Sequence, residues 1–131
     1  DTRWLRCDIK STSLLANVLA KEAAARVGAI ESILYRDGHI TEGSTSAIAI
    51  VKEGVLKAPP LDTTLLPSVT RTLTWQVAEA QGVVTVEAPI SIDECLGADE
   101  ILLMSSTKEI VPITRVDDHV LADGRPGNIW R

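Results

Sequence analysis

Residues 47–57 read AIAIVKEGVLK, which is an unbroken apolar run, a Glu53-Gly54 pair and a second short apolar run. Two apolar segments separated by a Gly-containing pair are typical of a β-hairpin, because glycine adopts the positive φ angles that tight turns require. Pro59-Pro60 follows and ends the second strand, since proline cannot donate a hydrogen bond to a neighbouring strand. The stretch therefore predicts a pair of antiparallel strands.

More strands are predicted on both sides of this hairpin. Residues 31–35 read as a short strand, and Asp37-Gly38 provides the chemistry of a tight turn before a further strand near Ile40. The run 100–104 holds an unbroken apolar stretch, which is typical of a strand buried on both faces. Two additional strands are expected at residues 83–88 and 110–116.

Helices are predicted between the strands. Residues 14–27 are rich in strong helix formers, contain no Gly or Pro, and stop before a glycine. Ser68 precedes a segment with apolar residues four positions apart, so it is placed to cap a helix that stops at Gly82. Residues 91–94 match a capping box and predict a short helix. Strands mixed with helices indicate an α/β or α+β domain.

Length and composition indicate one domain. The chain has 131 residues, of which 45% are hydrophobic, and this suffices for one core. The core must be aliphatic, because the chain has no Phe, one Tyr and three Trp. Cys7 and Cys95 are too few for a disulfide framework and lack the spacing of a zinc site, so we expect no metal and a reduced, cytoplasmic setting.

Charge and hydropathy exclude two classes of partner. The net charge is -5, and the Lys and Arg residues are scattered rather than gathered in a basic stripe, so no nucleic-acid partner is expected. No apolar run approaches the roughly 20 residues that a spanning helix needs, so no membrane is expected. The start, residues 1–4, is neither an initiator methionine nor a signal peptide. We therefore expect the chain to begin within a longer protein.

Some polar residues are candidates for chemistry, although each has an ordinary explanation when taken alone. Lys10 in RCDIKS fits a solvated surface lysine. Glu42 in TEGS fits a turn residue beside Gly43. Local composition does not decide between these alternatives and a functional role.

The joint order of four segments favours a functional role. They are RWLRCDIKS at 3–11, TEGSTS at 41–46, LLPSVTR at 65–71 and MSSTKEI at 104–110. Together they resemble the C-terminal domain of the class IV, or fold-type IV, pyridoxal-phosphate aminotransferases, and most closely the D-amino-acid aminotransferase group. The resemblance runs through nearly the whole chain. It implies a mixed sheet or pseudo-barrel flanked by helices.

The resemblance implies distinct roles for Lys10 and Glu42. Lys10 aligns with the lysine that holds pyridoxal 5′-phosphate as an internal aldimine and then moves the proton between substrate Cα and cofactor C4′. Only a primary amine forms that imine, and we expect a desolvated, cationic site to make it a better nucleophile and base. Glu42 aligns with the carboxylate that pairs with the pyridine nitrogen and keeps it protonated.

The phosphate is expected at the start of the helix after Ser68. The family pattern places Leu66 against the ring face and presents the backbone N–H groups of Val69 and Thr70 to the phosphate. Independently of the family, the free amides of a first helical turn bind anions. The alternative explanation is a plain capped helix.

Hydroxyl groups near the end of the chain complete the implied phosphate site. Ser106 aligns with a hydroxyl donor to the phosphate, and Ser105 or Thr107 is expected to assist. A Ser-Ser-Thr run after a buried strand is also ordinary loop composition.

The implied reaction is transfer of an amino group between an amino acid, with a D-amino acid such as D-alanine favoured, and a 2-oxo acid. Branched-chain aminotransferases and aminodeoxychorismate lyases share the same segments and are the alternatives. The resemblance also implies a homodimer and an N-terminal domain that is absent from residues 1–131. A catalytically incompetent isolated domain is therefore a further alternative.

Overall fold

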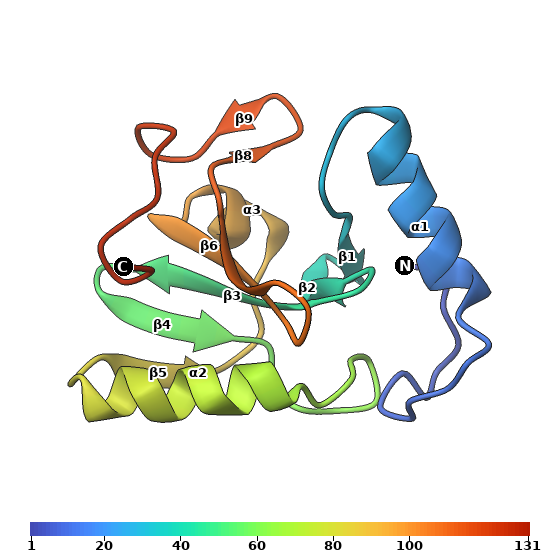
Figure 1. Ribbon diagram of the computed structural model, residues 1–131, viewed down its shortest axis with the longest axis horizontal. Coiled ribbons are helices and arrows are strands. Elements are labelled where there is room, and N and C mark those ends of the chain that lie inside the picture. Colours follow the sequence, from blue (N-terminus) through green and yellow to red (C-terminus); the bar gives the residue numbers. More distant parts are fainter.

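The computed structural model describes residues 1–131 and consists of a mixed sheet with helices on its two faces (Figure 1). The central sheet has five strands in the order β5-β4-β3-β6-β7, and two further pairs of strands lie beside it. This arrangement confirms the predicted α/β class. The elements are α1 (Leu15–Arg26), β1 (Ile33–Arg36), β2 (His39–Gly43), β3 (Ala47–Lys52), β4 (Val55–Ala58), α2 (Val69–Ala80), β5 (Val84–Glu87), α3 (Ile92–Leu96), β6 (Glu100–Ser105), β7 (Glu109–Ile113), β8 (Arg115–Val116) and β9 (His119–Val120).

The hairpin predicted from residues 47–57 forms the middle of the sheet. Strand β3 pairs with β4 in antiparallel register, and the turn has φ values of 51° at Glu53 and 78° at Gly54. On its other side β3 pairs with β6, also antiparallel. Strand β5 then adds parallel to β4 after the chain has crossed over through α2. A parallel neighbour requires such a crossover, and α2 provides it.

Strands β3 and β6 are buried on both faces, as the unbroken apolar run 100–104 predicted. Alternate residues of the two strands contribute to two separate cores. Ile48 and Ile101 pack with Cys95 of α3 on one face. Ala49 and Met104 belong to the core on the other face, which α2 covers (Figure 1).

The predicted hairpin around Asp37-Gly38 is present as β1 and β2. Its turn residues have φ values of 50° and 78°, and the strands pair antiparallel with an irregularity between Ile33 and Tyr35. The first strand begins at Ile33 rather than at the predicted residue 31. Glu31 instead turns its carboxylate toward the hydroxyls that follow β2, so a side-chain contact replaces the first strand pairings.

One predicted strand is divided in the structure. Residues 110–116 were expected to form a continuous strand, but β7 ends at Ile113 and the short β8 follows as part of a hairpin with β9. Strand β7 lies at the edge of the sheet, where Pro112 is tolerated because one side needs no hydrogen-bond donor. The turn between β8 and β9 has a positive φ of 50° at Asp117.

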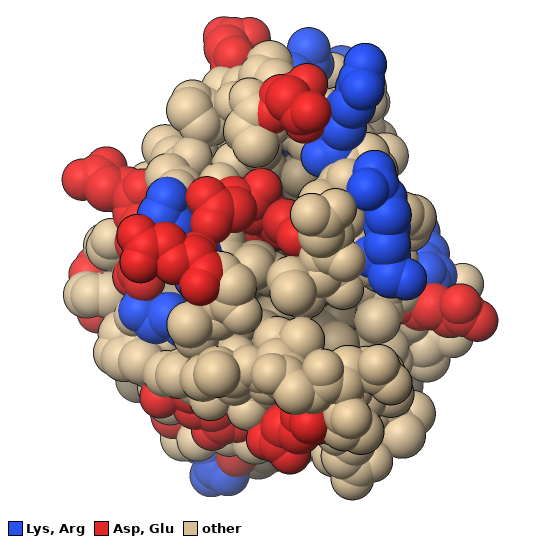
Figure 2. All heavy atoms as spheres, turned by 90° about the vertical axis from the view of Figure 1, so that its left-hand side faces the viewer, with Lys and Arg blue, Asp and Glu red and all other residues tan.

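Charges of both signs are mixed on the face that carries the C-terminus. Figure 2 shows acidic and basic side chains side by side there, with a broad uncharged area below them. Separately, none of the helices has the length and apolar character needed to cross a bilayer.

Candidate active site

A cavity of about 780 Å³ lies between the N-terminal segment, the β2–β3 turn, the start of α2 and the β6–β7 turn. These four regions are far apart in the sequence and correspond to the four segments that carry the family resemblance. The structure brings every predicted site residue to this one cavity, although their roles stay predictions. The predicted residues that line it are Lys10, Glu42, Leu66, Ser68, Val69, Thr70, Ser105, Ser106 and Thr107.

Lys10 is carried by an irregular segment that is fastened to the loop before α2. The amide of Cys7 donates to the carbonyl oxygen of Thr63 over 2.8 Å, and the Cys7 Sγ donates to the carbonyl oxygen of Trp4 over 3.2 Å. Lys10 itself is exposed. The expected desolvation of this amine is therefore not provided by residues 1–131.

Lys21 also lines the cavity, but its amine is engaged elsewhere. Its Nζ donates to the carbonyl oxygen of Ile30 and lies 3.6 Å from the carboxylate of Glu31. Lys10 takes part in no such ion pair in the structure. Of the two lysines, Lys10 is the one with an uncommitted amine.

Glu42 lies at the end of β2 and is 8% exposed. Its Oε1 accepts from Nη1 of Arg3, and its Oε2 accepts from the backbone amide of Leu66 over 3.1 Å. Burial raises the pKa of the Glu42 carboxyl above its usual range, and the Leu66 amide and the Arg3 guanidinium act against that rise. Each oxygen keeps a further lone pair, because a carboxylate oxygen accepts two hydrogen bonds. The group can therefore receive an additional N–H donor.

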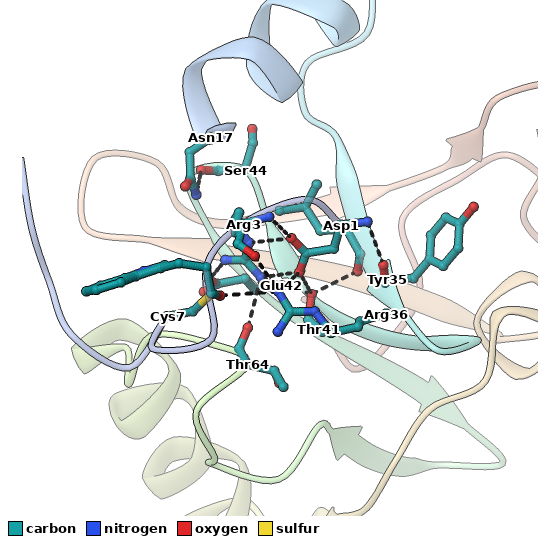
Figure 3. A network of polar contacts seen from close by, with 12 residues as sticks. Asp1, Arg3, Cys7, Asn17, Tyr35, Arg36, Thr41, Glu42, Ser44 and Thr64 are labelled. Atoms are coloured by element: carbon teal, nitrogen blue, oxygen red, sulfur yellow. Dashed lines mark hydrogen bonds and ion pairs between the residues drawn. The ribbon is translucent and has the colours of Figure 1, made fainter. Parts of the chain in front are cut away.

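Arg3 is a residue of this site that sequence reasoning missed. Its side chain is 5% exposed and pairs with both Asp1 and Glu42, as Figure 3 shows. It also donates to the carbonyl oxygen of Thr64 over 2.8 Å. Arg3 stands at the head of RWLRCDIKS, but nothing in that segment alone distinguishes a buried arginine from the exposed Arg6.

The start of α2 offers free amides to the cavity. The Ser68 Oγ accepts from the amide of Arg71 over 3.2 Å, which confirms the predicted cap. The amides of Val69 and Thr70 stand ahead of the first intrahelical bond and point out of the helix start. Val69 is 77% exposed, so solvent reaches this end of the helix. The helix dipole favours an anion there.

Hydroxyl groups of the β6–β7 turn line the same cavity. The Ser105 Oγ accepts from the amide of Lys108 over 3.2 Å, which orders the turn, while Ser106 and Thr107 are exposed. Ser106 thus keeps a free hydroxyl at the cavity wall. This arrangement allows hydroxyls to supplement the amides of α2.

A second feature missed from the sequence is the turn after Glu42. Glu31 accepts from the hydroxyls of Ser44, of Thr45 over 2.7 Å and of Ser46 over 3.1 Å. Burial acts to raise the pKa of Glu31, but the hydroxyls of Ser44 and Thr45, the amide of Ser32 and the charge of Lys21 outweigh it, so the pKa is lowered.

Gly43 is required in this turn for close approach. A Cβ on Gly43 would lie 2.2 Å from the Ser46 Oγ and 3.2 Å from the Glu31 Cγ. A side chain at this position would therefore displace the Ser46 hydroxyl and its contact with Glu31.

The donor set fits the group that the family implies. An uncommitted primary amine can hold an aldehyde, a buried carboxylate can accept an N–H from an aromatic ring, and helix amides with hydroxyls can bind a phosphate. Lys10, Glu42 and the amide of Val69 supply these functions from one cavity. The residues present are thus compatible with pyridoxal 5′-phosphate.

Solved structures share this fold. A branched-chain aminotransferase from Thermoproteus uzoniensis has a TM-score of 0.88 and 32% identity, over 95% of this chain and 41% of that one. The branched-chain amino acid aminotransferase from Escherichia coli has a TM-score of 0.85 and 32% identity, over 89% of this chain and 40% of its own. The fold is that of the fold-type IV aminotransferases.

Sequence comparison assigns the family. Residues 1–116 match the family described as amino-transferase class IV, and the chain belongs to that family. The D-alanine aminotransferase of Bacillus licheniformis is 42% identical over 131 residues, which are 100% of this chain and 46% of the relative. The D-alanine aminotransferase of Listeria monocytogenes is 43% identical over 129 residues, which are 98% of this chain and 45% of the relative. The chain therefore spans about half the length of the curated relatives it matches.

Proposed function

We propose that this chain carries the cofactor-binding and proton-transfer residues of a pyridoxal-phosphate-dependent aminotransferase. The observation that carries the proposal is the convergence of Lys10, Glu42 and the first amides of α2 on one cavity. Each of these groups suits a different part of the same small molecule. The proposed substrates are an amino acid, with D-alanine first, and a 2-oxo acid.

Each residue of the site would have a separate chemical role. When bound, pyridoxal phosphate supplies an aldehyde that accepts the amino group and a ring that withdraws electrons from the reacting carbon. Lys10 would hold the cofactor through its aldehyde carbon, with the aldehyde oxygen lost as water. Its amine, once displaced by the amino group of the substrate, would remove and return the proton at the substrate Cα.

Glu42 would hold a proton at the ring nitrogen. It can do so because its own position is fixed by Arg3 and by the Leu66 amide. Val69 and Thr70 would hold the phosphate through their amides, with Ser105 and Ser106 adding hydroxyl groups. Leu66 would pack on the ring face and exclude water from one side.

Lys10 is exposed in this chain, so a further covering element is needed for efficient chemistry. Exclusion of water strengthens electrostatic interactions within an active site. We propose that a second domain, as part of the longer relatives, provides this cover. Under this proposal residues 1–131 bind the cofactor, but without the cover they catalyse transamination inefficiently.

The choice of D-alanine rests on the curated relatives, which are named D-alanine aminotransferases at 42% and 43% identity. A branched-chain substrate is the second candidate, because solved structures of the same fold are named branched-chain aminotransferases. Comparing D-alanine with L-leucine as amino donors would separate them. Faster transfer from L-leucine would contradict the first assignment.

The decisive experiment is chemical labelling of the lysine. The chain is mixed with pyridoxal phosphate, reduced with borohydride, digested and mapped by mass spectrometry. We expect the label on Lys10, its retention in Lys21→Ala and its loss in Lys10→Ala. Lys21 is the matched control, since it lines the same cavity with an engaged amine. A label on Lys21 or no label on Lys10 would reject the proposal.

A labelled Lys10 without measurable transamination would support the alternative of an isolated domain that binds cofactor and does not turn over. A homodimer in the cytoplasm is part of the proposal by analogy with the family. Measurement of the mass in solution tests the dimer.

A further inference from the structure

Behind Glu42 lies a series of charged side chains that the proposed reaction does not use (Figure 3). The carboxylate of Asp1 has a side-chain exposure of 0%. It accepts from Nε of Arg3 over 2.9 Å and from Nη2 over 2.7 Å. Arg36 approaches the same carboxylate, with its Nη2 3.3 Å from Oδ2. Charges of alternating sign thus run from Arg36 through Asp1 and Arg3 to Glu42.

The contacts of Asp1 determine how Arg3 meets Glu42. A guanidinium group is planar, and Asp1 occupies the edge formed by Nε and Nη2. Nη2 is also bound to the carbonyl oxygen of Thr64. The remaining nitrogen, Nη1, is thereby turned toward Oε1 of Glu42.

If the charge of Arg3 were not compensated, it would strongly favour the ionised form of Glu42. The Glu42 carboxylate would then be a weak proton acceptor. Asp1 offsets the charge of Arg3, and Arg36 in turn offsets part of the charge of Asp1. The interactions are strong because Asp1, Arg3 and Glu42 are all buried.

We propose that Asp1 is a positioning residue that acts through Arg3 to set how strongly Glu42 holds a proton at the ring nitrogen of the cofactor. The inference rests on the proposed function for the role of Glu42. The contacts from Asp1 to Arg3 and from Arg3 to Glu42 stand independently of that role.

The groups that face Glu42 from neighbouring elements are few. Arg3 contacts one oxygen and the amide of Leu66 the other. Beyond Gly43, the carboxylate of Glu31 is balanced by Lys21 and by hydroxyl groups. Asp1 is therefore the charge in direct contact with Arg3 on the side away from Glu42, and its removal changes the environment of Glu42 through Arg3.

The test is the titration of Glu42 itself, followed by 13C NMR of the side-chain carboxyl in chain labelled at glutamate. In Asp1→Asn the side chain keeps its shape and one of the two acceptor oxygens but loses its charge. Arg3 is still held by Glu42 and by the carbonyl oxygen of Thr64, and its charge is no longer offset. We expect the titration midpoint of Glu42 to move to lower pH. A midpoint that stays unchanged in a folded Asp1→Asn chain would overturn the proposal.

The sign of the shift separates this role from a structural one. If Asp1 only fastened the N-terminal segment, its loss would release Arg3 and leave Glu42 buried without its cation. The Glu42 midpoint would then rise, because burial without a partner disfavours the carboxylate. A rise in Asp1→Asn would therefore count against the proposal.

Asp8→Asn is the matched control. Arg6 and Asp8 repeat the same two-residue spacing and the same paired contacts, with Nε to Oδ1 and Nη2 to Oδ2 each at 2.9 Å. This pair is exposed at the surface and does not line the cavity. We expect Asp8→Asn to leave the Glu42 midpoint unchanged.

Arg36→Gln provides a second, independent test of the coupling if Asp1→Asn fails to fold. Removal of Arg36 leaves Asp1 with a stronger effective charge against Arg3. The Glu42 midpoint is then expected to move to higher pH, opposite to the effect of Asp1→Asn. No movement in a folded Arg36→Gln chain would overturn the proposal.

The same variants are treated with pyridoxal phosphate and borohydride. If Lys10 is labelled in the parent chain but the Glu42 midpoint is unchanged in Asp1→Asn, the role of Asp1 is rejected and the proposed function is not. No label on Lys10 rejects the proposed function, and the role of Asp1 toward a cofactor falls with it.

Discussion

Lys10 and Glu42 occupy opposite environments, although the same resemblance predicted both. Lys10 is exposed, whereas Glu42 is 8% exposed and held by two donors. An amine that must reach first cofactor and then substrate needs freedom of movement. An acid that must face one ring nitrogen needs a fixed position, and Arg3 provides it. The two environments suit the two proposed roles.

The residue with the largest change in proton affinity lies outside the cavity. Cys95 is 2% exposed in the core between α3 and the sheet. Burial, together with the charge of Glu94, raises the pKa of its thiol from 9.0 to about 11. Only about a thousandth of this thiol is ionised at pH 8, against roughly a tenth for an unperturbed one. Native Cys95 should therefore resist iodoacetamide at pH 8 and react after denaturation.

The same shift predicts how stability depends on pH. Because the folded pKa is the higher one, the contribution of Cys95 is complete below pH 9 and is lost as pH rises toward 11. We expect a loss on the order of 2 kcal/mol in this window, measured by urea unfolding at several pH values. Cys95→Ala should remove that part of the pH dependence. An equal alkaline loss in the variant would contradict the assignment.

At the scale of elements, α2 shows what apolar spacing predicts and what it does not. Val69, Leu73 and Val77 recur every four positions and predict a helix, and the helix is present. This stripe is exposed, however, at 77%, 56% and 62%. The face that packs on the sheet instead contains Arg71 and Ala78. The spacing of the apolar residues predicted the helix correctly. The helix buries the face opposite to the apolar stripe against the sheet.

Two serine caps allow the proposed phosphate site on α2 to be tested against a matched control. Ser68 caps α2 at the cavity, and Ser91 caps α3 on the other face of the sheet, where its Oγ accepts from the amide of Glu94 over 3.0 Å. Replacement of either serine by alanine should cost about 1 kcal/mol of unfolding free energy. Ser68→Ala alone should also weaken binding of pyridoxal phosphate, roughly fivefold if a similar energy is lost in the complex. Equal affinities of the two variants would contradict a phosphate site at α2.

The predicted capping box of α3 forms only in part. Ser91 caps as expected, but the carboxylate of Glu94 pairs with Lys57 of β4 over 2.6 Å. A tertiary ion pair has therefore replaced the local return bond from Glu94 to the helix start. The helix still forms, because the serine cap and the packing of Ile92 and Cys95 remain.

At the scale of the whole molecule, a buried carboxylate fastens the last residues to the sheet. Glu100 is 7% exposed, and its two oxygens accept from the amides of Ile129 over 2.9 Å and Trp130 over 3.0 Å. A Cβ on Gly127 would lie 2.0 Å from the Glu100 Cδ, so the chain passes close to this side chain. The tail thereby covers the end of the central strands.

Glu100→Gln should release this tail. The amide offers only one acceptor oxygen and no charge, so we expect a loss of about 1–3 kcal/mol and faster cleavage of residues 126–131 by a protease. Glu109→Gln, at an exposed position on β7, is the control and should change neither property. A tail that is cut at the same rate in both variants would contradict the role of Glu100.

The amino-acid sequence by itself determined most of the elements and the family. Turns with glycine, serine caps and apolar runs act over a few residues, so Asp37-Gly38, Glu53-Gly54 and Ser68 could be interpreted locally. Exceptions occurred where another contact prevailed, as at the start of β1, where Glu31 binds the hydroxyls that follow β2, and in residues 110–116, where β8 pairs with β9.

Only the tertiary structure decided what surrounds the candidate site. Arg3 and Glu42 are 39 positions apart, and Asp1 reaches Glu42 only through Arg3. Pairing of such distant charges depends on how the N-terminal segment lies over the sheet, which no local pattern of residues specifies. The physical reason is that secondary structure follows from near neighbours, whereas burial and charge compensation follow from contacts that the completed fold creates.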